Sequence, residues 1–375
     1  MECRKIREGS TIIEVPAQDM TDHFPPGTAP VFFNHRMELN RDATVLLCSV
    51  IRPSDYLDGM GASGIRGLRI SGECGIPVTI NDRSREAVSL IRHNAAESDM
   101  PVEILNRDTN SLLSERAFDA VDLDPFGTPA PFVDAGVRGS RRFLFITATD
   151  TAPLCGAHKK AGIRRYFALP ANTDYHSEVA LRILLAFVVR ETVKYDRGIV
   201  PVFCFAKEHF IRLHLRLIRG AAAADRTLKR IGFVLQCPRC QFRSEKDGLF
   251  SGGGCCPYCG ESLMPIGPLY LGGIQETGVL HMMQERMSSL ELGTAKELAG
   301  MLTLCSEELP TSTFYDYHRI AKSEKVSPPD IGTVLVRIRD SGYAATRTHF
   351  SGYGIKTDAP VPDIVRAVRD GVSAR

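Results

Sequence analysis

The fold of this chain is decided by Asp55-Tyr-Leu-Asp58-Gly59-Met-Gly61-Ala-Ser-Gly64-Ile-Arg66-Gly67. The first residues predict a buried strand, the glycines a tight turn, and the last residues the start of a helix. A turn without side chains lets a nucleotide or an amino-acid group approach the backbone N–H groups of a helix N-terminus. The stretch by itself is equally typical of a dinucleotide or phosphate loop.

Three further units repeat the pattern of a strand that leads to an acidic residue. They are Pro77-Val-Thr-Ile80 before Asp82, Val102-Glu-Ile-Leu before Asp108, and Phe118-Asp-Ala-Val-Asp-Leu before Asp124. A single Asp of this kind usually caps a helix or a turn. Four successive acids indicate a ligand site instead, because ligands of open parallel sheets bind beyond the carboxyl ends of the strands.

The sequence therefore predicts an α/β fold with a Rossmann-like, doubly wound sheet. At its ligand edge Asp82 is placed for the two hydroxyls of a ribose, and Asp108 for the amine of an adenine. The backbone N–H of Thr109 lies beside Asp108 in the sequence and suits a ring nitrogen of the same base.

The segment Asp122-Leu-Asp124-Pro125-Phe126-Gly127 is the candidate for chemistry. An exocyclic amine on a flat base is a poor nucleophile, so a methyltransferase must hold its N–H groups and later accept a proton. Asp124 serves both needs, the Pro125 carbonyl is a second acceptor, and Phe126 gives the base a face to stack on. The alternative is a structural Pro-aromatic turn after an apolar strand.

Four cysteines form the pattern Cys237-Pro-Arg-Cys240 and Cys256-Pro-Tyr-Cys259, with fifteen residues between the pairs. This spacing predicts a zinc ribbon at 237–259, in which four thiolates hold one structural Zn²⁺. A disulfide pair is disfavoured by the expected cytoplasmic location, and free thiols by the spacing. Cys255 gives an alternative second pair, but only Cys256 repeats the Cys-Pro-x-Cys form.

Basic residues gather in the middle of a chain whose formal charge is only +2. The stretch 158–166 predicts an RNA phosphate contact through Lys159, Lys160, Arg164 and Arg165, with a solvated loop as the alternative. Further on, strict alternation in Phe210-Ile-Arg212-Leu-His214-Leu-Arg216 puts three basic side chains on one strand face. We expect that face to follow a nucleic-acid backbone or to meet water.

Length and composition predict a two-domain, cytoplasmic enzyme. The 375 residues suffice for two or three domains, and neither a signal peptide nor an apolar stretch long enough for a membrane is found. We expect a methyltransferase domain at 1–230, with an N-terminal lid segment, and a smaller α+β zinc-containing domain at 231–375. Within the latter, 310–360 predicts a winged-helix-like module.

The chain resembles the tRNA guanine-26-N2-dimethyltransferases, in particular their short archaeal members. The motifs that carry the resemblance are Phe33-Asn34-x-Arg36-Met-x-Leu-Asn40-Arg41-Asp42, the glycine-rich stretch 58–66, the segment 122–127, Thr147-Ala-Thr-Asp150, the four cysteines with Gly267-Pro268-Leu-Tyr270, and Thr348-His349 with Ile355-Lys356-Thr357-Asp358-Ala359-Pro360. Two positions depart from the family pattern, His35 in place of Pro and Tyr270 in place of Trp.

The resemblance implies S-adenosyl-L-methionine as methyl donor, tRNA as partner, and transfer of one or two methyl groups to N2 of guanine 26. Catalysis falls to Asp124, Pro125 and Phe126. Donor binding is expected from the residues Arg36, Asp58, Gly59, Gly61, Arg66, Asp82, Asp108 and Thr109. No obligate protein partner is evident. Two alternatives stay open: a methyltransferase for another exocyclic or amide nitrogen, and a non-enzymatic zinc-ribbon RNA-binding protein.

Overall fold

The protein, a computed structural model that describes residues 2–17 and 31–371, forms two compact units built from interleaved segments. The first unit comprises Met1–Ala148, Arg212–Ile218 and Glu276–Leu302. The second comprises Thr149–Ile211, Arg219–Gln275 and Thr303–Arg375. Each unit therefore closes its core with residues that lie far apart in the sequence.

The first unit is organised by a sheet whose strands follow the spatial order β5-β4-β3-β6-β7-β9. These strands are β3 (Tyr56–Asp58), β4 (Val78–Asn81), β5 (Val102–Leu105), β6 (Phe118–Leu123), β7 (Ser140–Ala148) and β9 (Phe210–Arg219). The pairs from β5 through β7 are parallel. The chain order reverses at β3 and β6, which makes their carboxyl ends the topological switch point of a doubly wound sheet. The predicted Rossmann-like fold is confirmed.

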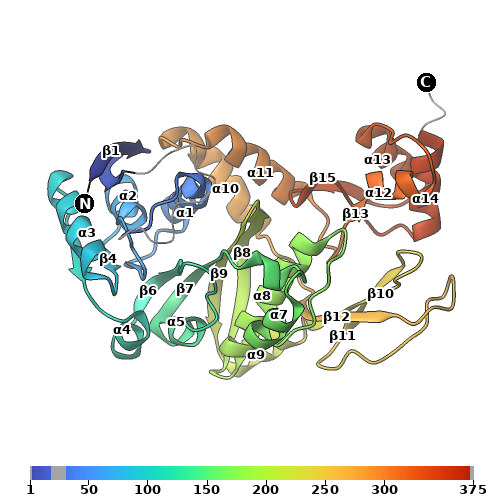
Figure 1. The fold of residues 1–375 in the computed structure, drawn as a ribbon, viewed down its shortest axis with the longest axis horizontal. Coiled ribbons are helices and arrows are strands. Elements are labelled where there is room, and N and C mark those ends of the chain that lie inside the picture. The colour runs from blue at the N-terminus through green and yellow to red at the C-terminus, as the bar shows by residue number, and fades with distance from the viewer. Residues whose placement is uncertain (1, 18–30, 372–375) are drawn as a thin grey trace. The chain divides into compact units, whose positions relative to one another are not determined.

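Helices alternate with the strands of this sheet along the chain, beginning with one helix before β3 (Figure 1). They are α1 (Glu38–Ile51), α2 (Ile65–Cys74), α3 (Arg85–Glu97), α4 (Thr109–Glu115) and α5 (Val133–Gly139), with a short turn η1 (His35–Met37) before α1. The unit also contains the hairpin β1 (Cys3–Glu8) and β2 (Thr11–Pro16), then α10 (Thr277–Arg286), η2 (Met287–Ser289) and the start of α11 (Ala295–Glu307). Local signals set the helix starts, since Ser84 caps α3 and Asp108 caps α4 through side-chain oxygens.

The second unit holds two three-stranded sheets, in the orders β11-β10-β12 and β13-β15-β14. Its strands are β8 (Arg197–Lys207), β10 (Ile231–Gln236), β11 (Arg243–Asp247), β12 (Met264–Tyr270), β13 (Tyr315–Asp316), β14 (Ala345–Thr348) and β15 (Ser351–Thr357). Its helices are α6 (Thr151–Leu154), α7 (Lys159–Tyr166), α8 (His176–Val193), α9 (Ala221–Leu228), α12 (Tyr317–Ser323), α13 (Ile331–Asp340) and α14 (Val361–Asp370). None of the helices in the described ranges has the length and apolar character of a membrane span.

A buried cluster of charges joins α8 to the C-terminal part of the second unit. Arg182 donates to Glu178, and also to the carbonyls of Tyr270 and Gly272 at 2.7 and 2.9 Å. Lys356 donates to the same Glu178 at 2.8 Å and to the Thr311 carbonyl at 3.0 Å. Lys356 belongs to a motif of the family resemblance, and its contacts here are structural.

Candidate active site at the carboxyl edge of the sheet

The predicted acidic residues meet at one edge of the first unit's sheet. Asp58 ends β3, Asp82 follows β4, Asp124 follows β6, and Asp108 stands between β5 and α4. The strand register sets Asp58 level with Ile80 on one side and with Asp122 on the other. The parallel sheet thus gathers carboxylates that lie up to 66 residues apart, as the sequence positions 58 and 124 show.

The glycine-rich turn after β3 is fastened to both neighbouring strands. The Gly59 N–H donates to the Asp122 carbonyl at 3.0 Å, and the Gly61 N–H to the Asn81 carbonyl at 2.9 Å. A Cβ on Gly61 would lie 2.4 Å from Ile80, so only glycine fits there. Gly64 adopts a φ of +83°, which favours glycine and starts α2.

Asp58 lies buried beneath this turn and accepts a hydrogen bond of 3.0 Å from the Gly67 N–H. Burial raises the pKa of the Asp58 carboxyl to about 7, and the negative charges of Asp122 and Asp124 add to the effect, while Arg66 opposes it. The group therefore changes its protonation near neutral pH, which is unusual for a carboxyl and typical of functional sites.

Arg66 links the donor-binding candidates to the catalytic candidate. Its buried guanidinium pairs with Asp124 and donates to Asn40 and Thr44 at 3.0 and 3.1 Å. The Asp124 side chain keeps 21% of its surface exposed, whereas Arg66 keeps 5%. Arg66 thus holds the Asp124 carboxylate from inside the protein and leaves part of it accessible.

Three of the predicted donor-binding residues lie at the expected edge of the sheet and also form hydrogen bonds within the protein. They are Asp82, Asp108 and Thr109. Asp82 accepts from the N–H groups of Ala62 and Ser84 at 3.0 and 2.8 Å. Asp108 caps α4 through the Ser111 N–H at 2.9 Å. The Thr109 hydroxyl donates to the Gly59 carbonyl at 2.8 Å. These contacts position the carboxylates, and each carboxylate retains acceptor capacity beyond them.

Asn81 is an organising residue that the sequence reasoning missed. Its buried amide donates to the carbonyls of Gly59 and Arg107, both at 3.1 Å, and its oxygen accepts from the Arg107 N–H. A single side chain thus ties the turn after β3 to the turn after β5. The sequence signal was present, because a polar residue ends an otherwise apolar strand.

The segment after β6 carries an exposed aromatic ring. Pro125 is buried, whereas Phe126 is 77% exposed and packs edge-on against Phe32 with ring centroids 5.3 Å apart. Phe32 was not among the predicted residues. Arg36 lies in η1 and is exposed, with its backbone N–H bonded to the Asn34 side chain.

The prediction that the basic residues of β9 form a face that follows a nucleic-acid backbone or meets water is wrong. Arg212 and His214 are fully buried, and Arg212 forms a two-pronged ion pair with Asp122 at 2.8 and 2.5 Å. Both faces of this part of β9 are covered, so the alternation does not separate core from solvent. Burial alone would raise the pKa of Asp122, but the charges of Arg212 and Arg66 outweigh it and hold that pKa well below its usual range. Only Arg216 is partly exposed, and it pairs with Glu276.

The predicted metal and RNA residues belong to the second unit. The sulfur atoms of Cys237, Cys240, Cys256 and Cys259 all lie within 4.8 Å of one another. Cys255 is exposed and is not a member of this cluster, which agrees with the choice of Cys256. The basic residues Lys159, Lys160, Arg164 and Arg165 are exposed on α7, and Arg165 pairs with Asp150 at 3.0 Å.

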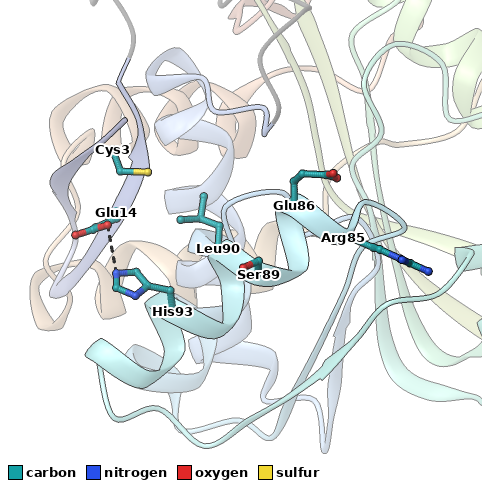
Figure 2. A pocket seen from close by; sticks show the side chains of 7 residues that line it. All are labelled: Cys3, Glu14, Arg85, Glu86, Ser89, Leu90 and His93. Carbon is teal, nitrogen blue, oxygen red and sulfur yellow. Dashed lines mark ion pairs between the residues drawn. The ribbon is translucent and has the colours of Figure 1, made fainter. Parts of the chain in front are cut away.

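A surface cavity of about 590 Å³ lies elsewhere on the first unit, between α3 and the β1–β2 hairpin (Figure 2). It is lined by Cys3, Glu14, Arg85, Glu86, Ser89, Leu90 and His93. Glu14 and His93 face each other across it at 3.2 Å. The predicted site residues are not among those that line it.

The family model of the N2,N2-dimethylguanosine tRNA methyltransferases matches residues 9–369. The chain belongs to this family. It is 64% identical over 369 residues to the tRNA (guanine(26)-N(2))-dimethyltransferase of Methanoregula boonei, covering 98% of this chain and 99% of the relative. The enzyme of the same description from Methanoculleus marisnigri is 56% identical, with 99% and 100% covered. The resemblance noted in the sequence is thereby confirmed.

A solved structure of Trm1 from Pyrococcus horikoshii with S-adenosyl-L-methionine is similar over almost the full length. Its TM-score is 0.87 at 32% identity, and the match covers 97% of this chain and 99% of the other. The expected enzyme class, a tRNA guanine-N2 methyltransferase, agrees with all these matches. The alternative of a non-enzymatic RNA-binding protein loses its support.

Proposed function

We propose that this protein transfers one and then a second methyl group from S-adenosyl-L-methionine to N2 of guanine 26 in tRNA. The observation that carries the proposal is Asp124-Pro125-Phe126 at the switch point of the sheet, held by Arg66, in a chain of this family. The other predicted amine substrates, such as adenine N6 or a protein amide, are supported by none of the family matches.

The residues at the carboxyl edge fit a donor that carries an amino-acid group, a ribose and an adenine. The tight turn 59–64 offers close approach to backbone at the start of α2. Asp82 has acceptor capacity for the ribose hydroxyls and Asp108 for the adenine amine, while the backbone N–H of Thr109 can donate to a ring nitrogen of the adenine. Arg36 and Asp58 complete the proposed donor site, as cation and anion for the amino-acid group. When bound, S-adenosyl-L-methionine supplies an electrophilic methyl group on a sulfonium centre.

The chain's own residues orient the guanine amine and accept its proton. The Asp124 carboxylate accepts an N–H of the guanine amine, the Pro125 carbonyl accepts the second, and Phe126 stacks on the base. These contacts hold the nitrogen in line for attack. Positioning of this kind makes the reaction of two separate molecules effectively unimolecular. As the C–N bond forms, the methyl–sulfur bond of the donor would break and leave a neutral thioether, and the amine proton then passes to Asp124. A guanine within tRNA has to leave its stack to reach these groups.

The four cysteines of the second unit are proposed to hold one structural Zn²⁺. Zinc–sulfur bonds of about 2.3 Å in a tetrahedron place sulfur atoms about 3.8 Å apart. The sulfur pairs Cys237–Cys259, Cys240–Cys256 and Cys240–Cys259 are separated by 3.5, 3.2 and 3.8 Å. The donor set is complete with four thiolates, so the ion has no open position for catalysis.

The function is tested by incubating the protein with labelled S-adenosyl-L-methionine and unmodified tRNA, followed by digestion to nucleosides. We expect N2-methylguanosine first and N2,N2-dimethylguanosine later. A tRNA with adenine in place of guanine 26 is the matched substrate control and should stay unlabelled. Label in any other nucleoside, or none at all, would refute the proposed function.

Donor affinity should depend on pH through Asp58. Its raised pKa of about 7 means that the side chain is mostly neutral at pH 6 and mostly ionised at pH 8. A cationic donor favours the ionised form, so its affinity should rise about tenfold from pH 6 to pH 8. Calorimetry with wild type and Asp58→Asn measures this. The donor's own titration is common to both proteins, so equal pH profiles would remove Asp58 from the donor site.

The zinc should be lost together with local structure when its ligands are removed. Elemental analysis should find about one zinc per chain in wild type and none in Cys237→Ala/Cys240→Ala, because zinc binding is coupled to folding of such a ribbon. Limited proteolysis should then cut the segment 237–259. Cys255→Ala is the matched control and should keep the metal. A metal-free protein with an intact ribbon contradicts the assignment.

A further inference from the structure

Phe167 is an exposed aromatic residue in an unfavourable backbone conformation. It follows the last residue of α7 with φ 51° and ψ 41°, and it is 67% exposed. Bulky residues rarely adopt this left-handed conformation, which favours glycine. Residues held in it cluster at functional sites. Packing in the hydrophobic core does not explain this conformation, because the ring is exposed to solvent.

Both chain neighbours of Phe167 are anchored in the second unit. Tyr166 is buried, packs edge-on against Phe187 at 5.6 Å, and donates its hydroxyl to Asp150 at 2.7 Å. On the other side, Ala168 is buried, and Leu169 exchanges two backbone hydrogen bonds with Gly267 at 2.6 and 3.1 Å. The backbone thus holds the ring outward, so little freedom is lost when a ligand stacks on it.

A guanidinium supports the ring from α8. The Arg190 Cζ lies 5.1 Å from the centroid of Phe167 and 5.5 Å from that of Phe187, and its Nη2 donates to the Tyr166 carbonyl at 3.3 Å. Arg190 is thereby fixed beside an exposed ring. An arginine and an aromatic ring in contact form a platform on which a flat, electron-rich group can stack.

The segment 151–173, which carries Phe167, has a positive net charge. No Asp or Glu occurs between Asp150 and Asp174, whereas this interval contains Lys159, Lys160, Arg164 and Arg165. Ile163, one helical turn before Phe167, is also partly exposed. A ligand that matches a flat ring beside several cations has a flat apolar part and negative charges close to it. A nucleotide within RNA has this chemistry.

We propose that Phe167 and Arg190 form a stacking site for an unpaired nucleobase of the tRNA, with the cations of α7 on the adjoining phosphates. The inference rests on the function proposed above and adds a contact outside the methylation site. Stacking does not depend on the identity of the base. The Phe167–Arg190 site therefore contributes to tRNA affinity and to the position of the tRNA on the protein, without selecting a base sequence.

The first test separates stacking from charge by equilibrium binding of unmodified tRNA. Phe167→Ala should weaken binding roughly 5- to 150-fold, the range for one lost base–aromatic stack. The slope of log affinity against log salt should stay the same, because no phosphate contact is lost. Lys160→Gln/Arg164→Gln should instead lower that slope by roughly two units. Donor affinity and single-turnover rate at saturating tRNA should be unchanged in Phe167→Ala.

A second variant excludes a merely structural role. Glycine is favoured at a φ of 51°, so Phe167→Gly should unfold at the same or a higher denaturant concentration than Phe167→Ala. It should nevertheless lose as much tRNA affinity. Tyr195→Ala is the matched control, because Tyr195 is also a partly exposed ring beside a cation, Lys194, but is followed by Asp196. Its tRNA affinity should not change.

A direct readout is available because the chain contains no tryptophan. Phe167→Trp should bind tRNA about as tightly as wild type, and its only indole should be quenched on binding. Tyr195→Trp should show no such quenching. Wild-type tRNA affinity in both Phe167→Ala and Phe167→Gly, or an unquenched Phe167→Trp in the complex, overturns the inference. If wild type neither binds tRNA nor methylates guanine 26, the proposed function itself has failed instead.

Discussion

Replacing Asp124 by alanine should lower the single-turnover rate of guanine methylation by at least about 100-fold, the scale of lost acid–base assistance. Two functions disappear together: an acceptor for the amine N–H and the group that takes its proton. The loss should appear in the rate at saturating tRNA, with tRNA affinity nearly intact, because the contact develops only in the reacting complex. Rapid-quench measurement of labelled nucleosides gives the rate.

Asp124→Asn makes the test sharper. The amide oxygen still accepts a hydrogen bond, but it cannot take the proton and cannot pair with the charge of Arg66. We expect a rate close to that of Asp124→Ala. A surface carboxylate provides the control: Glu97, paired with Lys5 at 3.2 Å and half exposed, should be replaceable by alanine without effect. A native rate in Asp124→Ala would end the proposed role.

Replacing Arg212 by methionine should lower the free energy of unfolding by about 3 to 5 kcal/mol, the cost of leaving a buried charge without its partner. Asp122 would remain fully buried, with Tyr56 and the more distant Arg66 as its remaining contacts. Arg212 also donates to Thr147 and Thr44 at 2.9 and 2.8 Å, so several buried acceptors lose a donor at once. Urea unfolding followed by circular dichroism measures the change.

Two further variants show whether the pair itself is the cause. Asp122→Asn added to Arg212→Met removes the orphaned charge and should restore part of the lost stability. Arg138→Met breaks an exposed pair with Asp134 at 3.0 Å and should cost less than about 1 kcal/mol. Equal decreases in the free energy of unfolding in Arg212→Met and Arg138→Met would show that the buried ion pair stabilises the protein no more than an exposed one.

The four strand-and-acid units, the glycine turn and the grouping of the four cysteines could be predicted because each depends on a few neighbouring residues. A glycine turn after a strand restricts the backbone locally, and the side chains of Ser84 and Asp108 start helices within three residues of themselves. The order of these units then implies a parallel sheet, and with it a common edge for Asp58, Asp82 and Asp124. The motif order also sufficed to identify the family.

The partners of those residues could not be predicted in the same way. Alternation on β9 suggested an exposed basic face, yet Arg212 pairs with Asp122, ninety residues earlier in the chain. Asn81 and Phe32 were missed because their importance lies in contacts with other turns. Phe167 likewise gains its interest from Tyr166, Arg190 and Gly267, which only the folded second unit brings around it.

The sequence by itself determined the local elements, the edge at which the acids gather and the chemistry that they suit. Only the tertiary structure decided which carboxylate is buried in an ion pair and which stays partly accessible. Asp122 and Asp124 are two residues apart, a spacing that would put both side chains on one face of a continuous strand, but β6 ends at Leu123, so Asp124 lies past the strand end and meets different partners. Asp122 is buried against Arg212, whereas Asp124, past the strand end, remains partly exposed beside Arg66. Burial and pairing of this kind depend on which strands become neighbours in the sheet, and that is a property of the whole first unit.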